Sequence, residues 1–527
     1  MMIDYKNNRI DYGETLSPPV GFQLDFAVAT TYSLDLFALL SIPVALFYSK
    51  NLDGKVSESR MDILDAIQKT SDKVKVYCQM GKIKVPKSFN KIVSFVDECV
   101  CEVAPSGEFT SFHPKVWVIK YSRKRGPSMF RVFVMSRNLT FDRSWDLSFY
   151  CEGFVGKSRI AKNQPLVDFV KYLTTHEGFV NSKSFLTELS KVEFEHDFKE
   201  LDFHPMGLRK DSSPIPVSCE NLLIVSPFVQ SDALARWSVQ TTGKKFLFSR
   251  LEELEKLDQK SLAGYNVYSF SDRIVDGEDY TDEGSEYEAR TQNLHAKLFV
   301  CENTGLTSWF LGSANSTAAA IDRNVEFMVE FKSDQQNMKV DEVKKQLLGN
   351  DPNRVYFEPY QKTDRDTEAS DDIEYEIRAA IHQLVSYAGN GGISGDCTIS
   401  EIGADKYDIT VSSEPSEAVK SKDFEITFSL YCRDEHRPFR PGKEETFMGV
   451  NLENLSPFLS WKLVHVPSGT EKEFITKMDI SIPDGRKDAI LRSIIRNKEK
   501  FFQFLQFLLG KEMAVTQFSD VAEKTEE

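Results

Sequence analysis

Short apolar runs typical of strands alternate along the chain with amphipathic segments typical of helices. A strand-like run at 22–32 leads into an apolar helical stretch at 34–47, for which Ser33 is the predicted N-cap, with Asp35 in the first turn. Further strands are predicted at 73–77, 112–121 and 129–135, and helices at 165–175 and 184–192. This alternation predicts an α/β fold.

The same order of elements appears a second time. Strands are predicted at 222–225, 244–248, 294–301 and 309–312, with a charged helix at 251–262. An acidic loop at 272–288 precedes the third of these strands, either as a cover over a site or as a solvated surface loop. One repeat of this length predicts a duplicated domain rather than a solenoid.

The pattern changes after a polar, acidic stretch at 361–373, which is typical of a linker. Six candidate strands and a closing amphipathic helix follow, at 397–402, 407–412, 424–431, 446–450, 461–465, 474–482 and 487–509. We therefore predict a first half at 1–205, a second half at 206–360, and a β-rich C-terminal domain with a terminal helix at 374–527.

Composition and charge allow several partners. The 527 residues are 41% hydrophobic, which suffices for one large core and a second one. The net charge of −15 is uneven, because residues 1–200 hold 27 Lys and Arg against 24 Asp and Glu. The acidic excess lies in the remainder of the chain. The total charge therefore overstates how strongly the chain would repel nucleic acid, and a nucleic-acid partner stays possible.

Cysteine spacing and hydropathy indicate a cytoplasmic protein. The eight cysteines form no CxxC pair, which argues against a disulfide framework or a zinc site and fits a reducing compartment. The first ten residues are polar, without the apolar core of a signal peptide. The most apolar stretch, 34–47, contains Asp35 and Pro43 and is too short to span a bilayer. We expect no membrane partner.

Two matching sets of polar residues carry the candidate chemistry. Each set has His-x-Lys before one strand and Ser-x-Asn after the next: His113, Lys115, Ser136 and Asn138, then His295, Lys297, Ser313 and Asn315. In an extended segment, residues i and i+2 project to the same face. An antiparallel hairpin would bring each Asn beside its His-Lys pair. The spacing from Lys to Asn is 23 positions in the first set and 18 in the second.

These residue types fit displacement at a phosphodiester. One imidazole can attack phosphorus and form a phosphohistidine, while the other protonates the leaving group and later activates water. Two ammonium groups and two amides can hold the phosphoryl oxygens. The sequence has no spaced carboxylate cluster that suggests a metal site. The prediction is a metal-independent phosphodiesterase with no cofactor.

The second set resembles the phospholipase D signature, which is His-x-Lys, four residues, an acid, then Gly-Ser-x-Asn. Glu302 stands at the acid position, where Asp is usual, and nine residues rather than six separate it from Gly312. Asn324-Val-Glu326 also resembles the family's Asn-x-Glu, so Glu326 is expected to orient a histidine. Glu302 either braces the second half or is a surface acid.

The first set departs further from that signature. Lys120 stands at the acid position, and Ser136-Arg-Asn138 replaces Gly-Ser-x-Asn. The segments HPKVWVIKY, RVFVMSRNLT and WFLGSANST are similar to tyrosyl-DNA phosphodiesterases, and the likeness covers roughly residues 20–355. The segment TTYSLDLFALLSIPVA looks like bacterial phospholipase D-like proteins found beside helicases in defence gene clusters.

The resemblance implies a pseudo-twofold pair of phospholipase D-like domains with one active site at their junction. It implies His113 as nucleophile and His295 as acid and base. It also implies a nucleic-acid substrate, DNA rather than RNA, with a helicase or another defence-system subunit as candidate partner. One local asymmetry agrees, because Glu302 and Glu326 lie in the half of His295 and would favour its imidazolium.

Two other functions stay open. A phospholipase or lipid transphosphatidylase would need a membrane-facing apolar surface, and none stands out in the sequence. A non-catalytic, phosphate-binding subunit of a larger assembly would use the C-terminal domain for docking. That alternative is weakened because all six His, Lys and Asn positions are present. The sequence does not indicate an oligomeric state.

Overall fold

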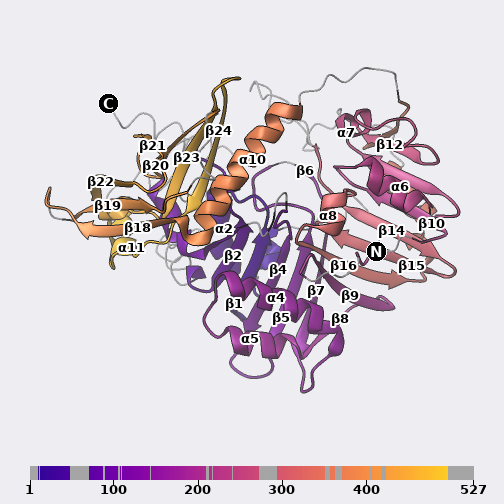
Figure 1. The fold of residues 1–527 in the computed structure, drawn as a ribbon. Helices are drawn as coiled ribbons and strands as arrows, with labels where there is room; N and C mark the ends of the chain where they lie inside the picture. The colour runs from indigo at the N-terminus through magenta and orange to yellow at the C-terminus, as the bar shows by residue number, and fades with distance from the viewer. Residues whose placement is uncertain are drawn as a thin grey trace, which may run out of the picture. The chain divides into compact units, whose positions relative to one another are not determined.

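The structure is a computed structural model (Figure 1). It describes residues 10, 12–47, 70–86, 89–104, 107, 110–142, 144–208, 213–215, 218–239, 241–271, 293–349, 356–362, 371–403, 405–416 and 423–495.

The strands of the first half follow the order β3-β2-β1-β4-β5-β7-β8. Strands β2 and β3 are parallel, whereas β4, β5 and β7 form an antiparallel meander. All seven residues of β5 are buried, as expected for a central strand. The bounds are β1 (Gln23–Thr31), β2 (Val74–Gln79), β3 (Val100–Val103), β4 (Val116–Ser122), β5 (Met129–Met135), β7 (Ser148–Val155) and β8 (Val192–Glu195).

The second half repeats this topology in the order β17-β12-β11-β10-β14-β15-β16-β9. Parallel β10, β11 and β12 correspond to β1, β2 and β3, and antiparallel β14, β15 and β16 correspond to β4, β5 and β7. The predicted α/β class and its duplication are confirmed. The bounds are β9 (Glu200–Met206), β10 (Asn221–Val225), β11 (Lys245–Ser249), β12 (Asn266–Phe270), β14 (Leu298–Asn303), β15 (Leu306–Gly312), β16 (Glu326–Ser333) and β17 (Phe357–Pro359).

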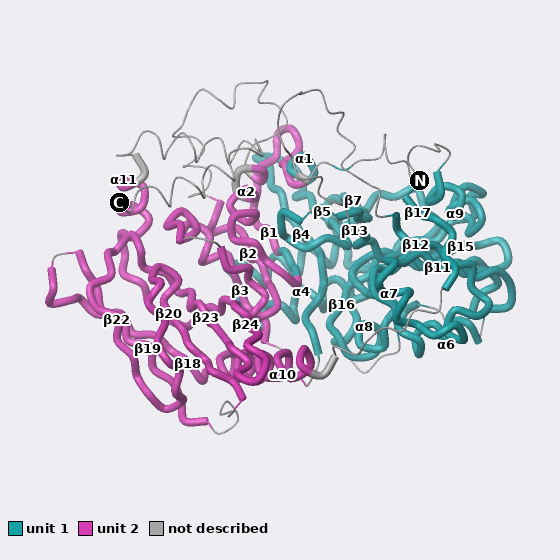
Figure 2. The backbone as a smooth tube through the Cα atoms, turned by 90° about the horizontal axis from the view of Figure 1, so that it is seen from above, with its two compact units in different colours: residues 1–15, 29–31, 110–368 teal, residues 16–28, 32–109, 369–527 magenta. Residues whose placement is uncertain are grey.

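The chain forms two compact units that do not follow chain order (Figure 2). Unit 1 comprises 1–15, 29–31 and 110–368, and unit 2 comprises 16–28, 32–109 and 369–527. Every residue of the two His-Lys-Asn sets belongs to unit 1. The domain boundaries at 205 and 360 stay a prediction.

Unit 1 buries its sheets under short helices. Trp237 of α6 packs against Phe299 of β14, and Phe169 of α4 packs against Phe327 of β16, with ring centroids 5.7 and 4.8 Å apart. Thr317 caps α8 by accepting a hydrogen bond from the backbone N–H of Ala320. The helices of this unit are α1 (Tyr12–Leu16), α4 (Gln164–His176), α5 (Ser182–Leu189), α6 (Ser231–Val239), α7 (Leu251–Glu255), α8 (Ala318–Asp322) and α9 (Val340–Leu348).

Unit 2 contains the β-rich C-terminal region that the sequence predicts. Its two sheets have the orders β18-β19-β22 and β21-β20-β23-β24, and Trp461 lies fully buried in their shared core. Arg486 forms a buried ion pair with Asp97 (2.6 Å) at the start of the terminal helix. Besides β2 and β3, the unit contains α2 (Leu36–Phe47), α10 (Asp371–Tyr387), β18 (Ile393–Ile399), β19 (Lys406–Ser413), β20 (Phe424–Leu430), β21 (Arg437–Pro438), β22 (Glu444–Asn451), β23 (Phe458–His465), β24 (Thr470–Lys477) and α11 (Arg486–Ile495).

Three local expectations are corrected. Asp35, not Ser33, caps α2, because its carboxylate accepts the N–H of Phe37 at 2.9 Å. Helix α7 ends at Glu255, well short of the predicted 262, and α10 was not predicted. The acidic loop 272–288 lies outside the described residues. Among the helices that are described, none combines the length and apolar character needed to cross a bilayer.

Candidate active site

Both His-x-Lys segments stand immediately before the first strand of an antiparallel hairpin. Strand β4 pairs with β5 from Val116 opposite Val134, and β14 pairs with β15 from Leu298 opposite Leu311. The residues just before β4 and β14 therefore lie beside those just after β5 and β15. The hairpin geometry inferred from the sequence is confirmed in both halves.

The backbone of each histidine is fixed by the opposite half of the duplication. The N–H of His113 donates to the carbonyl of Val325 at 2.8 Å, and that of His295 donates to Trp145 at 2.9 Å. A two-residue strand, β6 (Ser144–Trp145), pairs in parallel with β13 (Asn293–Leu294) just before His295. Phe112 and Val325 form the matching parallel bridge. The two halves thus exchange equivalent contacts, as a pseudo-twofold arrangement requires.

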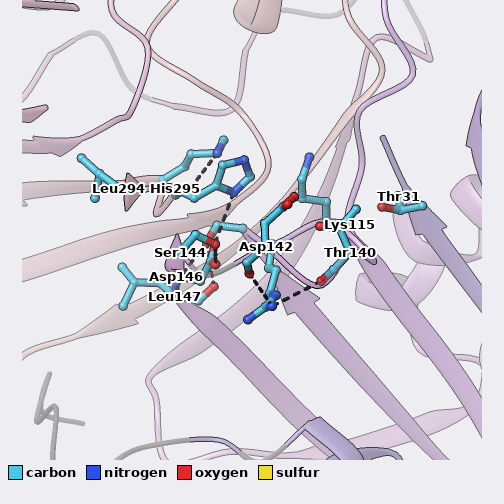
Figure 3. Close-up of polar contacts among 12 residues, drawn as sticks. Thr31, Lys115, Thr140, Asp142, Ser144, Asp146, Leu147, Leu294 and His295 are labelled. Atoms are coloured by element: carbon cyan, nitrogen blue, oxygen red, sulfur yellow. Dashed lines mark hydrogen bonds and ion pairs between the residues drawn. The ribbon is translucent and has the colours of Figure 1, made fainter. Parts of the chain in front are cut away.

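Each imidazole contacts a carboxylate that belongs to the opposite half. His113 Nδ1 lies 2.9 Å from Glu326 Oε2, and His295 Nδ1 lies 3.2 Å from Asp146 Oδ1. Figure 3 shows the second of these contacts, with Asp146 pointing toward the ring of His295. The side chain of Glu326 is fully buried, and that of Asp146 is 14% exposed. The site therefore holds two His-carboxylate pairs, each built from both halves.

The serine that begins each Ser-x-Asn segment holds one carboxylate in place. Ser136 donates its hydroxyl to Asp146 Oδ1 at 2.8 Å, and its Oγ accepts the N–H of Leu147 at 3.0 Å. Ser313 likewise donates to Glu326 Oε2, and its Oγ accepts the N–H of Phe327 at 2.9 Å. The predicted site residue Ser313 thus acts on the carboxylate and touches neither imidazole in any contact described here.

A second polar neighbour holds the other oxygen of each carboxylate. Asn324 Nδ2 donates to Glu326 Oε1 at 3.3 Å, and the Ser144 hydroxyl donates to Asp146 Oδ2. Burial alone would raise the pKa of Asp146, but hydrogen bonds from His295, Ser144 and Ser136 bring it down to about 2. Asp146 is therefore ionised at neutral pH and accepts hydrogen bonds only.

These contacts correct the expected positions of the acids. Glu326 contacts His113, not the histidine of its own half, so the expectation that Glu326 favours the imidazolium of His295 was wrong. Glu302 accepts the N–H of Val340 at 3.2 Å and stands seven residues beyond His295, roughly 20 Å along the strand. It takes no part in the site.

Asp146 was missed by the sequence analysis, although a signal was present. Ser144-Trp-Asp146 stands in the first half where Asn324-Val-Glu326 stands in the second, and both follow the Ser-x-Asn segment. Aligning the two halves on these three-residue segments places Asp146 opposite Glu326. The Asn-x-Glu motif was recognised in the second half alone, because in the first half Ser replaces Asn and Asp replaces Glu.

The two lysines are fully buried at the centre of the site. Lys115 Nζ lies 3.0 Å from both Nε2 and the carbonyl oxygen of His113, and Lys297 Nζ donates to the His295 carbonyl at 2.6 Å. Burial lowers the pKa of Lys115 to about 7. Burial and the charge of Lys115 hold the pKa of Lys297 well below its usual range. An anion bound between these ammonium groups would relieve both effects.

Both imidazoles have lowered pKa values, which keep the rings neutral at neutral pH. Burial lowers the pKa of His113 to about 4, with Glu326 opposing this shift and Lys115 adding to it. Burial and Lys297 lower the pKa of His295 to about 3, against the pull of Asp146. Because the carboxylates accept, each Nδ1 carries the hydrogen. Nε2 of each ring then carries the electron pair that nucleophilic attack requires, and in His113 this atom faces Lys115 Nζ at 3.0 Å.

The asparagines of the two sets occupy equivalent loops. The residue after Asn138 donates its N–H to Thr31 Oγ1 at 2.9 Å, and the residue after Asn315 donates to Ser226 Oγ at 2.9 Å. The Oδ1 atom of Asn315 is buried without a hydrogen-bond partner among the described residues. Rotation of the amide by 180° would present Nδ2 at the same place, as a phosphoryl oxygen needs.

The described residues include no group of three or more His, Cys, Asp or Glu side chains arranged to hold a metal ion. The positive charge of the site comes from its lysines. Imidazole nucleophiles, buried cations and amide donors together can hold and displace a phosphoryl group.

Comparison with known proteins gives similarity at the level of solved structures. A structure of yeast tyrosyl-DNA phosphodiesterase is 11% identical, with 59% of this chain and 82% of that chain covered and a TM-score of 0.35. A point variant of the yeast enzyme is 10% identical, with 61% and 84% covered and a TM-score of 0.37. No family model and no curated protein matches the chain.

Proposed function

We propose that this chain is a metal-independent phosphodiesterase that hydrolyses nucleic acid through a phosphohistidine. The observation that carries the proposal is the pair of crossed His-carboxylate contacts around two buried lysines. Two fully buried lysines beside two imidazoles are unusual for a purely structural role, since burying a charged group is costly. A bound phosphodiester would add a negative charge that favours the ammonium form of both lysines.

The reaction has two displacements. Binding of the phosphodiester anion favours the imidazolium form of His295, so its ring enters the reaction with a proton on Nε2. Nε2 of His113 attacks phosphorus, the bond to the leaving oxygen breaks, and that oxygen takes this proton from His295. Water then attacks the phosphohistidine and gives a proton to His295, while the bond between phosphorus and Nε2 breaks. Lys115, Lys297, Asn138 and Asn315 hold the non-bridging oxygens in both transition states.

The assignment of the two histidines rests on the resemblance of the first set to the phospholipase D family. The crossed pairs are nearly equivalent, since each ring has one carboxylate at Nδ1. One difference favours His113 as nucleophile: Lys115 Nζ lies 3.0 Å from its Nε2, the atom that must meet the phosphate. The first ring is thus already oriented toward a phosphate-binding cation.

We propose DNA rather than RNA as the substrate, and the cytoplasm as the location, from the sequence resemblance and the cysteine spacing. A helicase or another defence-system subunit as partner is proposed on the same resemblance. The boundaries 1–205, 206–360 and 374–527 serve as starting points for truncation.

Hydrolysis assays on single-stranded DNA, RNA and phosphatidylcholine test the proposed activity. We expect cleavage of DNA by the full chain and none by His113→Ala. Turnover of phosphatidylcholine alone would replace the proposal with a lipid phosphodiesterase. Phosphate binding without turnover of any of the three substrates would leave a non-catalytic binding protein.

A further inference from the structure

An exposed aromatic side chain stands next to the site without a role in the proposed chemistry. Phe228 follows β10 and is 40% exposed, whereas its neighbours Pro227 and Val229 are buried. The guanidinium carbon of Arg250, which follows β11, lies 4.8 Å from the centroid of its ring. That distance is within the range of a cation–π contact. The exposed ring is therefore held by a charged partner.

Arg250 connects this pair to His295. Its Nε and Nη2 atoms donate to the carbonyl oxygen of Leu294 at 2.8 and 2.5 Å. Leu294 is the residue immediately before the catalytic histidine. Nη1 has no hydrogen-bond partner in the described part of the chain, which leaves a donor for a ligand.

Phe228 is connected in the same way to the loop of Asn315. The hydroxyl of Ser226 donates to the Phe228 carbonyl at 2.7 Å, and its oxygen accepts the N–H of Ser316 at 2.9 Å. Val229 then forms a parallel bridge with Ser316. The Phe228–Arg250 pair is thus tied on one side to the residue before His295 and on the other to the residue after Asn315.

Strand register explains this placement. Val225, the last residue of β10, pairs with Leu298, the first residue of antiparallel β14. Phe228 lies three positions beyond Val225, and His295 lies three positions before Leu298, so both extend past the same edge of the sheet. Parallel β11 ends at that edge and delivers Arg250 to it.

We propose that Phe228, held by Arg250, is a base-stacking subsite for a single-stranded nucleic acid whose scissile phosphate lies between the lysines. This subsite rests on the proposed function and names the part of the substrate that the second half recognises. A nucleobase offers a planar π-face that stacks on an aromatic ring regardless of sequence. The donor at Arg250 Nη1 can meet a neighbouring phosphate.

The surroundings of Phe228 favour a base over a lipid. A membrane-inserting surface needs several contiguous apolar side chains. Here one ring projects between two buried neighbours, with a guanidinium over it. A single planar ligand fits this geometry.

The first half contains a pair of the same kind at the corresponding places. Within unit 2, Lys82 Nζ lies 5.6 Å from the ring centroid of Tyr32. Tyr32 follows β1 and Lys82 follows β2, just as Phe228 follows β10 and Arg250 follows β11. Recurrence of an aromatic ring with a cation after the same two strands indicates a feature of the duplicated domain.

Base removal in the substrate gives the decisive test. The full chain is assayed on single-stranded DNA oligonucleotides in which one nucleotide at a time is abasic, and on methyl p-nitrophenyl phosphate, which has no base. For the wild-type chain, kcat/KM should fall roughly 5- to 100-fold when one particular base next to the cleaved bond is missing, the scale of losing one stack. Phe228→Ala should cause a similar loss on intact DNA and be insensitive to removal of that base.

Three controls complete the design. Phe228→Trp should restore cleavage of intact DNA, and Tyr150→Ala, which removes an aromatic residue that is 47% exposed on β7, should behave as wild type. Phe228→Ala, Phe228→Trp and Tyr150→Ala should all hydrolyse methyl p-nitrophenyl phosphate at the wild-type rate, which would show that each variant has folded.

The possible outcomes distinguish a failure of the proposed subsite from a failure of the proposed function. If Phe228→Ala cleaves DNA as well as wild type does, or still loses activity when the base is removed, the subsite is wrong although the phosphodiesterase stands. If wild type hydrolyses methyl p-nitrophenyl phosphate but no oligonucleotide, nucleic acid is not the substrate. If wild type hydrolyses neither, the proposed activity itself fails.

Discussion

Glu326 accepts a hydrogen bond from His113, a residue 213 positions earlier in the chain, and no contact described for it reaches His295 in its own half. The reciprocal contact joins Asp146 to His295, 149 positions later. Each imidazole therefore depends on the opposite half for its tautomer and its orientation. A single half would present a histidine without its carboxylate, so the duplication is required for one complete site.

The carboxylates should control turnover without touching the substrate. Glu326→Gln and Asp146→Asn keep the shape of each side chain but allow the imidazole to adopt the other tautomer. We expect kcat to fall by about 10²- to 10⁴-fold in each variant, the range seen for orienting carboxylates. Steady-state kinetics on DNA would measure this, with thermal unfolding to confirm that the variants fold.

Glu302→Gln is the matched control, because Glu302 lies on β14 and contacts the first residue of α9, away from the site. It should keep near-wild-type kcat. Equal losses in Glu302→Gln and Glu326→Gln would show that removal of any acid from the second half has this effect, and would remove the basis for crossed pairs.

The pH dependence of kcat/KM should report Lys115 and His113. Burial lowers the pKa of Lys115 to about 7, so its charge is lost as pH rises through that value and phosphate binding weakens. The pKa of His113, about 4, leaves the ring neutral and nucleophilic above that pH. On a p-nitrophenyl phosphodiester, whose leaving group needs no proton from His295, the profile should therefore be bell-shaped, with limbs near pH 4 and 7.

Lys115→Arg separates the two limbs, because a guanidinium stays charged throughout this range. The alkaline limb should move to higher pH, even if the maximal rate falls. An alkaline limb that stays in place would mean that another group is responsible for it.

Loss of either lysine should cost catalysis more than stability. Lys115→Ala and Lys297→Ala should each lower turnover by roughly two to three powers of ten, the scale of one preorganised charge donor. The midpoint of thermal unfolding should change little, since each substitution removes a buried cation that its neighbour repels. Lys124→Ala, an exposed lysine in the β4–β5 turn, is the control. Near-normal turnover in one of the two lysine variants would show that the half containing that lysine has a structural rather than a catalytic role.

Metal removal should leave activity intact. The proposed steps use imidazole, ammonium and amide groups, so hydrolysis should persist in saturating EDTA. An assay with and without chelator, followed by added Mg²⁺, measures this directly. Abolition by EDTA and recovery with Mg²⁺ would contradict the mechanism.

Local patterns in the sequence predicted the duplicated α/β fold and the two hairpins, because strand periodicity and the position of Ser-x-Asn are short-range signals. They did not predict which acid meets which histidine. Local spacing assigns Glu326 to the histidine of its own half, because contacts across a pseudo-twofold axis leave no trace in the spacing of residues along the chain. Asp146 was hidden by conservative changes, and α10 by its place after an acidic stretch that is typical of a linker.

The covalent intermediate should form on His113. With a p-nitrophenyl phosphodiester the leaving group departs without an acid, so the first step no longer needs His295. In His295→Ala the second step still lacks its base, and a phosphohistidine should accumulate. Asp146→Asn should show the same accumulation more weakly, because it disturbs only the orientation of His295. Glu326→Gln should instead slow formation of the adduct, since it acts on His113. Rapid quenching at alkaline pH, where phosphohistidine persists, and peptide mass spectrometry would locate the phosphoryl group. An adduct on His295 in the wild-type chain would reverse the two roles and exchange the expected effects of the carboxylate variants. Hydrolysis that proceeds with no adduct in any variant would favour direct attack by water.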